Sequence, residues 1–201
     1  PMAWIFDKLK VGIGNKQLKP EADWIQCPKC HQNNLQSELK KNLKVCPQCE
    51  YHHRLNAMER IQLLANPDSF EEYDNHLLSS DPLKFKDKKK YIDRLKEAKN
   101  KTNKDDAILV KQGKIGGQKA VVGVLDFEFM GGSMGSAVGE GIIAAAEKAI
   151  EINSALVVFT SSGGARMQEG IFSLMQLPRT IIAVNNLKDN KLPYIVVLAD
   201  P

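Results

Sequence analysis

The clearest pattern of apolar positions lies in the second half of the chain. The run Ala155–Thr160 is short, apolar and β-branched and a glycine pair follows it, so it predicts a buried parallel strand that ends in a tight turn. Strong helix formers come next and predict a helix over about 166–187. A second helix is predicted over about 137–152, with its apolar residues on one face, and another apolar strand over 194–199. Strands that alternate with helices in this way predict βαβ units.

The residues before this region add a hairpin and a helical connector. Strands are predicted over 107–111 and 119–127, joined by a glycine-containing turn over 113–117. Upstream, residues 56–104 carry two apolar stripes at helical spacing, which we expect to dock onto the larger domain. The first stripe is Met58, Ile61, Leu64 and Ala65, and the second is Tyr91, Ile92, Leu95 and Ala98.

All four cysteines lie in the first quarter of the chain, as two C-x-x-C pairs. Cys27 and Cys30 form the first pair, and Cys46 and Cys49 form the second after a spacer of fifteen residues. Two such pairs at this separation predict a four-cysteine zinc site, because each pair turns two thiolates toward one point. Four protein ligands leave no position for water, so the metal is expected to be structural; two disulfides are the alternative.

Few apolar residues lie between the two cysteine pairs, so the metal must supply much of this module's stability. This combination predicts a small zinc ribbon. The expected organisation is an N-terminal segment with the ribbon over residues 1–55, the helical connector over 56–104, and an α/β domain from residue 105 to residue 201.

Composition limits the broad class of protein. With 201 residues and 43% hydrophobic content the chain can bury a sizeable core, and no stretch approaches the roughly 20 apolar residues of a membrane helix. The first residues lack the apolar region of a secretory signal, so we expect a cytoplasmic or plastid location with reduced thiols and no membrane association.

Positive charge is concentrated in the front half. Residues 1–104 hold 20 Lys or Arg against 14 Asp or Glu, whereas the rest of the chain is slightly acidic. Such a surface suits nucleic acid, an anionic carrier protein or a phosphorylated cofactor. A lysine-rich helix is more often only a solvated face, which is the simpler interpretation of residues 84–104.

The glycine pair after the strand at 155–160 is the best candidate for chemistry. Gly163 and Gly164 have no Cβ, so their backbone N–H groups can turn outward, and the start of a helix would add partial positive charge. This geometry can hold an oxyanion such as an enolate; a plain turn is the alternative. No histidine follows His76 and no Walker-type loop is present, so a serine–histidine pair and ATP hydrolysis are not expected in the α/β part.

Three segments in order along the chain carry a family resemblance. They are residues 129–136 (FMGGSMGS), residues 161–169 (SSGGARMQE) and residues 192–195 (LPYI), and the cysteine-rich start precedes them. Together they resemble the β subunit of the bacterial and plastid acetyl-CoA carboxylase carboxyltransferase.

The resemblance implies a fold and a set of site residues. The fold is α/β, a crotonase-like ββα spiral preceded by the ribbon and the connector. It is incomplete at the C-terminus, because family members continue past Pro201 with another Gly-Gly segment that is the expected place of a second oxyanion donor. Gly163 and Gly164 are the implied catalytic donors, and Gly131 and Gly132 are expected to pack closely or line the substrate pocket. Two roles are considered for Arg166: it contacts a phosphate of CoA, or it forms a structural ion pair.

The resemblance also implies a reaction and partners. A carboxyl group passes from N1-carboxybiotin on the biotin carboxyl carrier protein to acetyl-CoA and gives malonyl-CoA for fatty acid synthesis. The implied assembly is α2β2 with a carboxyltransferase alpha subunit, working with biotin carboxylase. Two other hypotheses about the function are kept. The protein is a subunit of a related acyl-CoA carboxylase or decarboxylase, or it is a nucleic-acid-binding protein that uses the ribbon. In the nucleic-acid hypothesis the basic residues that would bind are Lys40, Lys41, Lys44, Arg54 and Arg60.

Overall fold

The computed structural model describes residues 23–64, 69–72 and 78–200 and divides into two compact units, residues 1–54 and residues 55–201. Ala65 of the first apolar stripe lies outside the described residues.

The first unit is a small ribbon. Strands β1 (Trp24–Gln26) and β2 (Asn33–Leu35) pair antiparallel, and the short helix α1 (Gln36–Lys41) follows at once. Besides two cysteines, Leu39 is the one hydrophobic side chain that is buried in the described part of this unit. The expectation that the module has almost no apolar core is therefore confirmed for these residues.

The second unit is built on a mixed five-stranded sheet in the order β3-β4-β5-β6-β7. Its β3–β4 and β4–β5 pairs are antiparallel, whereas β5–β6 and β6–β7 are parallel and are connected through helices. The predicted βαβ units are thus confirmed. The strands are β3 (Glu71–Glu72), β4 (Ile108–Ile115), β5 (Gln118–Leu125), β6 (Ala155–Thr160) and β7 (Tyr194–Leu198).

The predicted hairpin is present, but its turn is tighter than expected. Strand β4 runs on to Ile115, so Gly113 lies inside the strand, opposite Ala120. The turn consists of Gly116 and Gly117, which both have positive φ (55° and 83°). A two-residue turn of this kind matches the twist of the paired strands and favours glycine, which is why both strands extend further toward the turn than predicted. At its other end β5 stops at Leu125, two residues before the predicted bound.

Side chains of the central strands alternate between two buried faces. Val121, Leu156 and Val158 join one hydrophobic cluster with the helix α4 (Ser136–Glu151) and the helix α6 (Gln176–Asp189). Val122 and Val157 point to the opposite face. Burial on both faces explains why these strands are almost continuously apolar.

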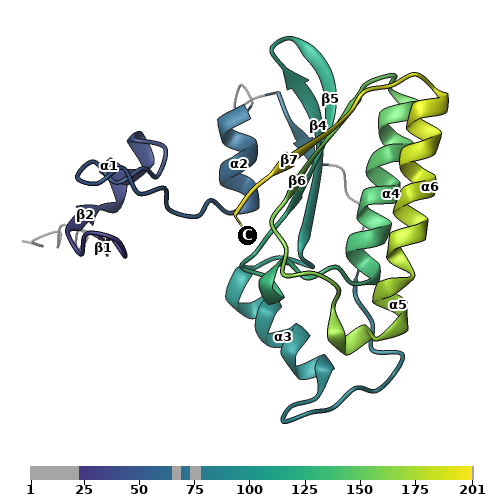
Figure 1. The fold of residues 1–201 in the computed structure, drawn as a ribbon, viewed down its shortest axis with the longest axis horizontal. Helices are drawn as coiled ribbons and strands as arrows, with labels where there is room; N and C mark the ends of the chain where they lie inside the picture. The colour runs from purple at the N-terminus through teal and green to yellow at the C-terminus, as the bar shows by residue number, and fades with distance from the viewer. Residues whose placement is uncertain (1–22, 65–68, 73–77, 201) are drawn as a thin grey trace, which may run out of the picture. The chain divides into compact units, whose positions relative to one another are not determined.

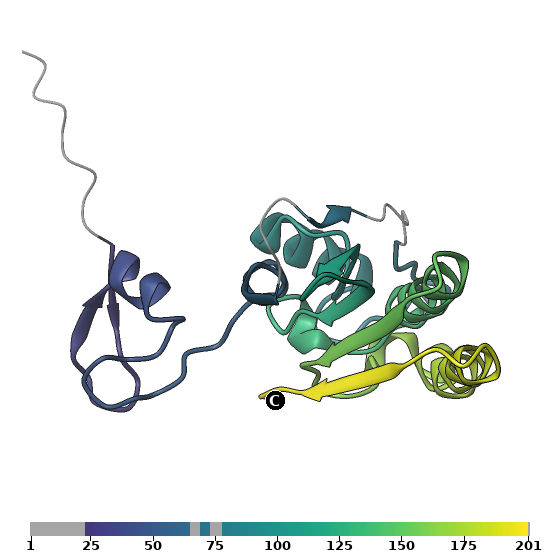
Figure 2. The ribbon, with the colours of Figure 1, turned by 90° about the horizontal axis from the view of Figure 1, so that it is seen from above.

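The two connector helices pack on the same unit. Helix α2 (Ala57–Leu64) buries Ala57 and Ile61 against the second face of the sheet, on the side opposite α4 and α6 (Figures 1 and 2). Helix α3 (Tyr91–Thr102) buries Tyr91 and Leu95 in the first cluster. Docking of the stripes is confirmed for Ile61, Leu64, Tyr91, Leu95 and Ala98. It is wrong for Met58 and Ile92, which are 39% and 41% exposed because they lie off the face that each helix turns to the core.

The helix predicted over 166–187 is wrong in its first part. Residues Met167–Glu169 form one 3₁₀ turn, Gly170 breaks the chain with φ 52° and ψ −125°, and a four-residue helix α5 (Ile171–Leu174) precedes α6. Helix-forming residue types dominate this stretch, but the local contacts of the turn override their propensity. No long helix therefore begins at the Gly163-Gly164 turn, and the expected contribution of a helix N-terminus at that point is absent.

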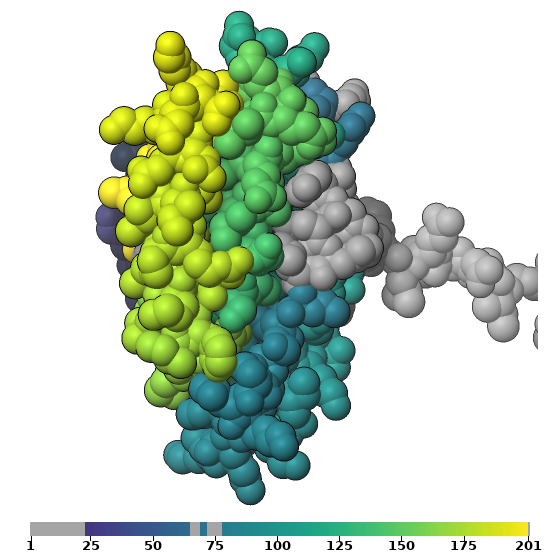
Figure 3. All heavy atoms as spheres, turned by 90° about the vertical axis from the view of Figure 1, so that its right-hand side faces the viewer, coloured from purple at the N-terminus to yellow at the C-terminus, as the bar shows by residue number. Residues whose placement is uncertain are grey.

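Helices α4 and α6 lie side by side on one surface of the unit (Figure 3). Part of this surface is apolar and exposed; Ile182 is 61% exposed. None of the helices that the structure describes combines the length and the apolar character that a membrane crossing requires.

Candidate functional site

Two glycine-containing loops lie against each other at the carboxyl ends of β5 and β6. The Gly163 N–H donates to the carbonyl of Gly131 (2.9 Å), and the Met134 N–H donates to the carbonyl of Gly164 (2.8 Å). The Arg166 N–H then donates to the carbonyl of Met134 (2.9 Å). The structure therefore brings the two predicted glycine pairs into one site, which sequence separation alone does not reveal.

Three of the glycines adopt backbone conformations that side chains disfavour. Gly131 and Gly132 form a 3₁₀ turn, η2 (Met130–Gly132), with φ 67° and 64°, and Gly164 has φ 106°. A Cβ on Gly132 would lie 2.0 Å from the carbonyl oxygen of Ser161, so this position allows only glycine. A Cβ on Gly164 would meet nothing within 4 Å, so the reason for glycine there is conformation and not space.

The two predicted N–H donors differ in availability. The Gly163 N–H is already bonded to Gly131, whereas the Gly164 N–H donates to the side-chain hydroxyl of Ser162 (3.1 Å) in an exposed position. A hydroxyl can rotate away at small cost, but the Gly163–Gly131 bond would have to break before Gly163 could bind a ligand. Gly164 is therefore the better placed of the two donors.

An open cleft of about 750 Å³ lies beside the loops. Gly131, Ser133 and Ala165 form the side of the cleft next to the glycines, and helix α3 forms another side. Its lining mixes apolar and charged groups, which suits a ligand with an apolar arm and polar ends. The other lining residues are Arg94, Glu97, Ala98, Lys101, Phe127, Glu128, Met130, Met167 and Gln168.

Arg166 belongs to the protein interior. Its side chain is 0% exposed, and its guanidinium pairs with the buried carboxylate of Asp106 (2.6 Å) and donates to the carbonyl of Ser133 (2.8 Å). Burial by itself would lower the pKa of Arg166, but the hydrogen bond and the charge of Asp106 outweigh this and raise it. Of the two interpretations of Arg166, the structure supports the structural ion pair.

Sequence reasoning missed the partners of Arg166. Glu169 is buried and accepts a hydrogen bond from the Tyr91 hydroxyl (2.7 Å), and Tyr91 also accepts one from Arg166 (3.2 Å). Burial is the main reason why the pKa of Tyr91 is raised, so this hydroxyl stays protonated. Asp106 and Tyr91 lie far from Arg166 in sequence and match no motif, and Glu169 ends the 161–169 segment without a sign of its role, so only the fold could reveal this network.

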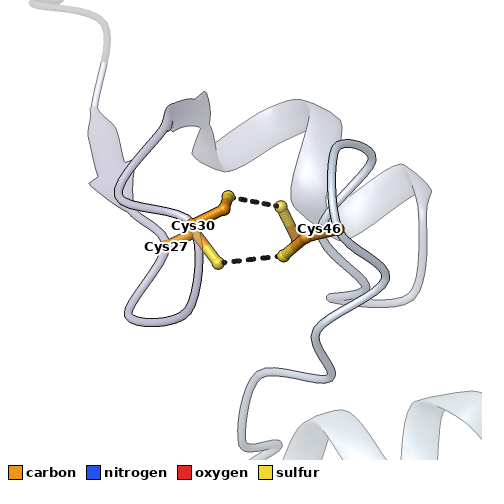
Figure 4. A group of neighbouring side chains, drawn as sticks. Cys27, Cys30 and Cys46 are labelled. Atoms are coloured by element: carbon orange, nitrogen blue, oxygen red, sulfur yellow. Dashed lines mark hydrogen bonds between the residues drawn. The ribbon is translucent and has the colours of Figure 1, made fainter.

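The four cysteines form one cluster in the ribbon. Their sulfur atoms all lie within 4.8 Å of one another, and the closest pairs are Cys27–Cys49 (3.7 Å) and Cys30–Cys46 (3.8 Å). The side chains of Cys27 and Cys30 face that of Cys46 (Figure 4). A tetrahedral zinc ion with Zn–S bonds of about 2.3 Å requires sulfur atoms roughly 3.8 Å apart, so the cluster fits this ion. All four thiols are free, so the alternative of two disulfide bonds is not supported.

The two cysteine pairs share one backbone geometry. The His31 N–H donates to the carbonyl of Cys27 and the Glu50 N–H to that of Cys46, both at 2.9 Å, and both donors have φ 58°. Burial would raise the pKa of the Cys46 thiol, but backbone N–H groups of Gln48 and Cys49 lower it to about 6, whereas burial and the neighbouring thiols raise the pKa of Cys49 to about 12. The thiolate is therefore favoured at Cys46 and disfavoured at Cys49 as long as no metal is bound.

Comparison with known families assigns both units. Residues 51–201 match the family described as the carboxyl transferase domain, and residues 24–49 match the acetyl-CoA carboxylase zinc finger domain. The β subunit of the acetyl-CoA carboxylase carboxyl transferase from Gluconacetobacter diazotrophicus is 44% identical over 202 residues, which cover 100% of this chain and 67% of that protein. The chain belongs to the acetyl-CoA carboxylase carboxyl transferase β-subunit family. The four-cysteine ribbon is accordingly the zinc site of this family.

Two further family members give the same result. The β subunits from Granulibacter bethesdensis and Hirschia baltica are 47% and 48% identical and cover the whole chain. The chain spans 66% and 58% of their lengths, respectively.

Solved structures place the second unit in the crotonase-like carboxyltransferase fold. A transcarboxylase 12S structure with methylmalonyl-coenzyme A and methylmalonic acid bound has a TM-score of 0.56 at 26% identity, over 82% of this chain and 30% of that chain. A Pseudomonas malonate decarboxylase hetero-tetramer in complex with malonate has a TM-score of 0.57 at 26% identity. The match covers 73% of this chain and 51% of that chain. The expected fold class is thus confirmed.

Proposed function

We propose that the chain forms the β part of a carboxyltransferase that moves a carboxyl group from carboxybiotin to acetyl-CoA and gives malonyl-CoA. In this reaction the bond between the biotin N1 and the carboxyl carbon breaks, and a bond forms between that carbon and the methyl carbon of the acetyl group. The methyl proton passes to the ureido nitrogen or oxygen of biotin. The observation that carries the proposal is the pair of interlocked glycine loops beside the cleft, in a chain of this family.

The protein's task in this reaction is to hold negative charge. Removal of the methyl proton turns the thioester carbonyl into an enolate, and N–H donors that point to its oxygen stabilise this charge. The exposed N–H of Gly164 suits that role, and Gly163 shapes the turn through its bond to Gly131. Gly131 is proposed to line the substrate cleft, and Gly132, which is buried against Ser161, to keep the two loops in close contact. Biotin can accept the proton itself, so the described residues need no histidine base.

An α chain is the proposed partner. Large apolar side chains on α6 and β7 are exposed; Leu198 is 85% exposed, and Ile182, Ile181 and Ile195 are also open to solvent. An exposed apolar surface of this kind is typical of a protein contact. Since the relatives are longer than this chain, we expect this surface to be covered in the full-length α2β2 assembly, which also works with the biotin carboxyl carrier protein and biotin carboxylase.

The experiment uses the full-length chain assembled with its α subunit, the carboxylated carrier protein, and acetyl-CoA or propionyl-CoA at equal concentration. We expect malonyl-CoA as the main product, measured by mass spectrometry, and little methylmalonyl-CoA. Preference for propionyl-CoA would make the chain part of a different acyl-CoA carboxylase. Release of CO₂ from malonyl-CoA as the faster reaction would favour a decarboxylase.

A second role for the ribbon rests on one observation. Trp24 is 61% exposed on β1, and the last turn of α1 carries the exposed residues Lys40 and Lys41. An exposed aromatic ring and basic side chains are the groups that bind single-stranded nucleic acid. We expect the affinity for single-stranded nucleic acid to fall steeply as the salt concentration rises and to be weaker in Trp24→Ala. An affinity that does not depend on salt, or no binding at low salt, would contradict this role.

A further inference from the structure

Two buried acids and one buried arginine join the glycine loops to the rest of the fold. Arg166 follows the Gly163-Gly164 turn, and its guanidinium reaches Asp106, which precedes β4, as well as Ser133 in the other loop. Its Nε also donates to the hydroxyl of Ser133 (3.2 Å). One side chain thus fixes the spacing between the two loops.

Glu169, whose carboxylate lies 3.6 Å from the Arg166 guanidinium, joins the same two loops through a second set of bonds. One of its carboxylate oxygens accepts hydrogen bonds from the backbone N–H (2.6 Å) and the hydroxyl (2.7 Å) of Ser136, the first residue of α4. The other oxygen accepts from Tyr91 (2.7 Å). The fit is tight, because a Cβ on Gly135 would lie 2.5 Å from this second oxygen. A carboxylate at the N-terminus of a sixteen-residue helix is also favoured by the helix dipole.

The free energy needed to bury these charges is high for a network with a purely structural role. Buried ion pairs contribute little net stability, and apolar side chains of similar size are often as good or better. Besides Asp106, Tyr91 and Ser79, the bonds of Arg166 and Glu169 end on Ser133 and Ser136, which flank Met134. Met134 is the residue whose backbone holds Gly164 and Arg166 in place.

We propose that Arg166 and Glu169 are positioning residues that set the direction of the Gly164 N–H by holding the two loops in one fixed register. This inference rests on the proposed function of Gly164. A donor that stabilises developing charge tolerates little displacement, and an error of about 1 Å can reduce a rate by roughly 10²-fold. Both side chains are buried and neither lines the cleft, so both act through the backbone.

The test compares three variants of the full-length chain in its assembly with the α subunit. Glu169→Gln keeps the shape but removes the charge that faces the α4 terminus and Tyr91. Ser136→Ala removes only the hydroxyl bond to Glu169 and keeps the backbone bond. Glu151→Gln is the matched control, since Glu151 forms an ion pair with Lys148 at the C-terminal end of α4, the end opposite Ser136.

We expect kcat per folded assembly to fall about 10-fold or more in Glu169→Gln and several-fold in Ser136→Ala, with the KM for acetyl-CoA within about threefold of wild type. The control should keep both constants. Amide hydrogen exchange at Met134, Gly163 and Arg166 should accelerate in the same order, which tests the register without any activity. A purely structural role would instead lower the yield of folded chain and leave kcat per folded assembly unchanged.

The two readouts separate the two proposals. Faster exchange in Glu169→Gln, together with a wild-type assembly that makes no malonyl-CoA, would show that Glu169 fixes the register of the loops but would overturn the proposed function and, with it, the catalytic purpose of that register. An active wild type combined with unchanged kcat and unchanged exchange in Glu169→Gln would overturn the positioning role.

Discussion

Replacement of Gly164 with alanine separates a catalytic glycine from a simple turn. The new Cβ would have open space around it, so the variant introduces no clash with neighbouring atoms. The only penalty is the φ of 106°, which an alanine resists by about 1–3 kcal/mol. The backbone can relieve this strain by rotating the peptide, which would turn the N–H of residue 164 away from its present direction.

The expected loss of rate exceeds the expected loss of stability. A strain of about 1–3 kcal/mol lowers the melting temperature by roughly 2–4 °C per kcal/mol in a domain of this size. A lost oxyanion donor costs about 10²–10³ in rate, which is roughly 2.7–4 kcal/mol of transition-state stabilisation. We therefore expect kcat to fall about 10²-fold, while KM for acetyl-CoA changes little because the donor matters most when charge develops.

Gly117→Ala is the matched control for this experiment. Gly117 has φ 83°, a Cβ there also meets nothing within 4 Å, and the residue lies in the β4–β5 turn, outside the two loops. It should lose a similar amount of stability with no loss of rate per folded assembly. The assay is malonyl-CoA formation by the full-length α–β assembly, with thermal unfolding measured on the same samples. If Gly164→Ala transfers carboxyl groups as fast as Gly117→Ala, Gly163-Gly164 is only a turn.

Three further predictions concern the metal, the second glycine loop and an alkaline titration. The purified protein should contain about one zinc per chain bound by sulfur alone, and Cys46→Ser should expose the ribbon to proteolysis while residues 55–201 stay folded; histidine in the ligand shell would contradict this. Gly132→Ala should destabilise the second unit more than Gly164→Ala, because its Cβ would lie 2.0 Å from Ser161, and equal melting temperatures would refute that reasoning. Burial lowers the pKa of Lys104, but hydrogen bonds to Asp126 and Glu128 outweigh it and raise the pKa. Its contribution to stability should therefore be complete below pH 10.5 and lost as pH rises through the raised value, so the difference in melting temperature between wild type and Lys104→Met should shrink only above that pH.

The sequence predicts most of the fold because the strongest patterns are local. A continuous apolar run identifies β6, helical spacing identifies α4, and two C-x-x-C pairs identify the zinc ribbon. The break at Gly170 is only partly predictable in this way. Most of residues 166–187 favour a helix and Gly170 is a local signal against it, but the 3₁₀ turn before Gly170 is held by the buried network around Glu169, which forms only after distant segments meet.

The candidate site likewise has features that the sequence predicts and others that depend on the fold. The sequence identifies both glycine pairs, but their mutual hydrogen bonds depend on the parallel pairing of β5 and β6. Whether Gly163 or Gly164 has the more available N–H is decided by the carbonyl of Gly131, more than thirty residues away in sequence. Asp106 and Tyr91 lack any motif and become visible only through their contacts with Arg166.

The most direct test of the central claim is a single-turnover transfer of labelled carboxyl. The carrier protein is loaded with ¹³C-carboxybiotin, freed of bicarbonate, and mixed with acetyl-CoA and the full-length α–β assembly. The account predicts ¹³C-malonyl-CoA in an amount that matches the loss of carboxybiotin, and none when the β chain is omitted. Label that appears only as bicarbonate, or equal transfer without the β chain, would contradict it.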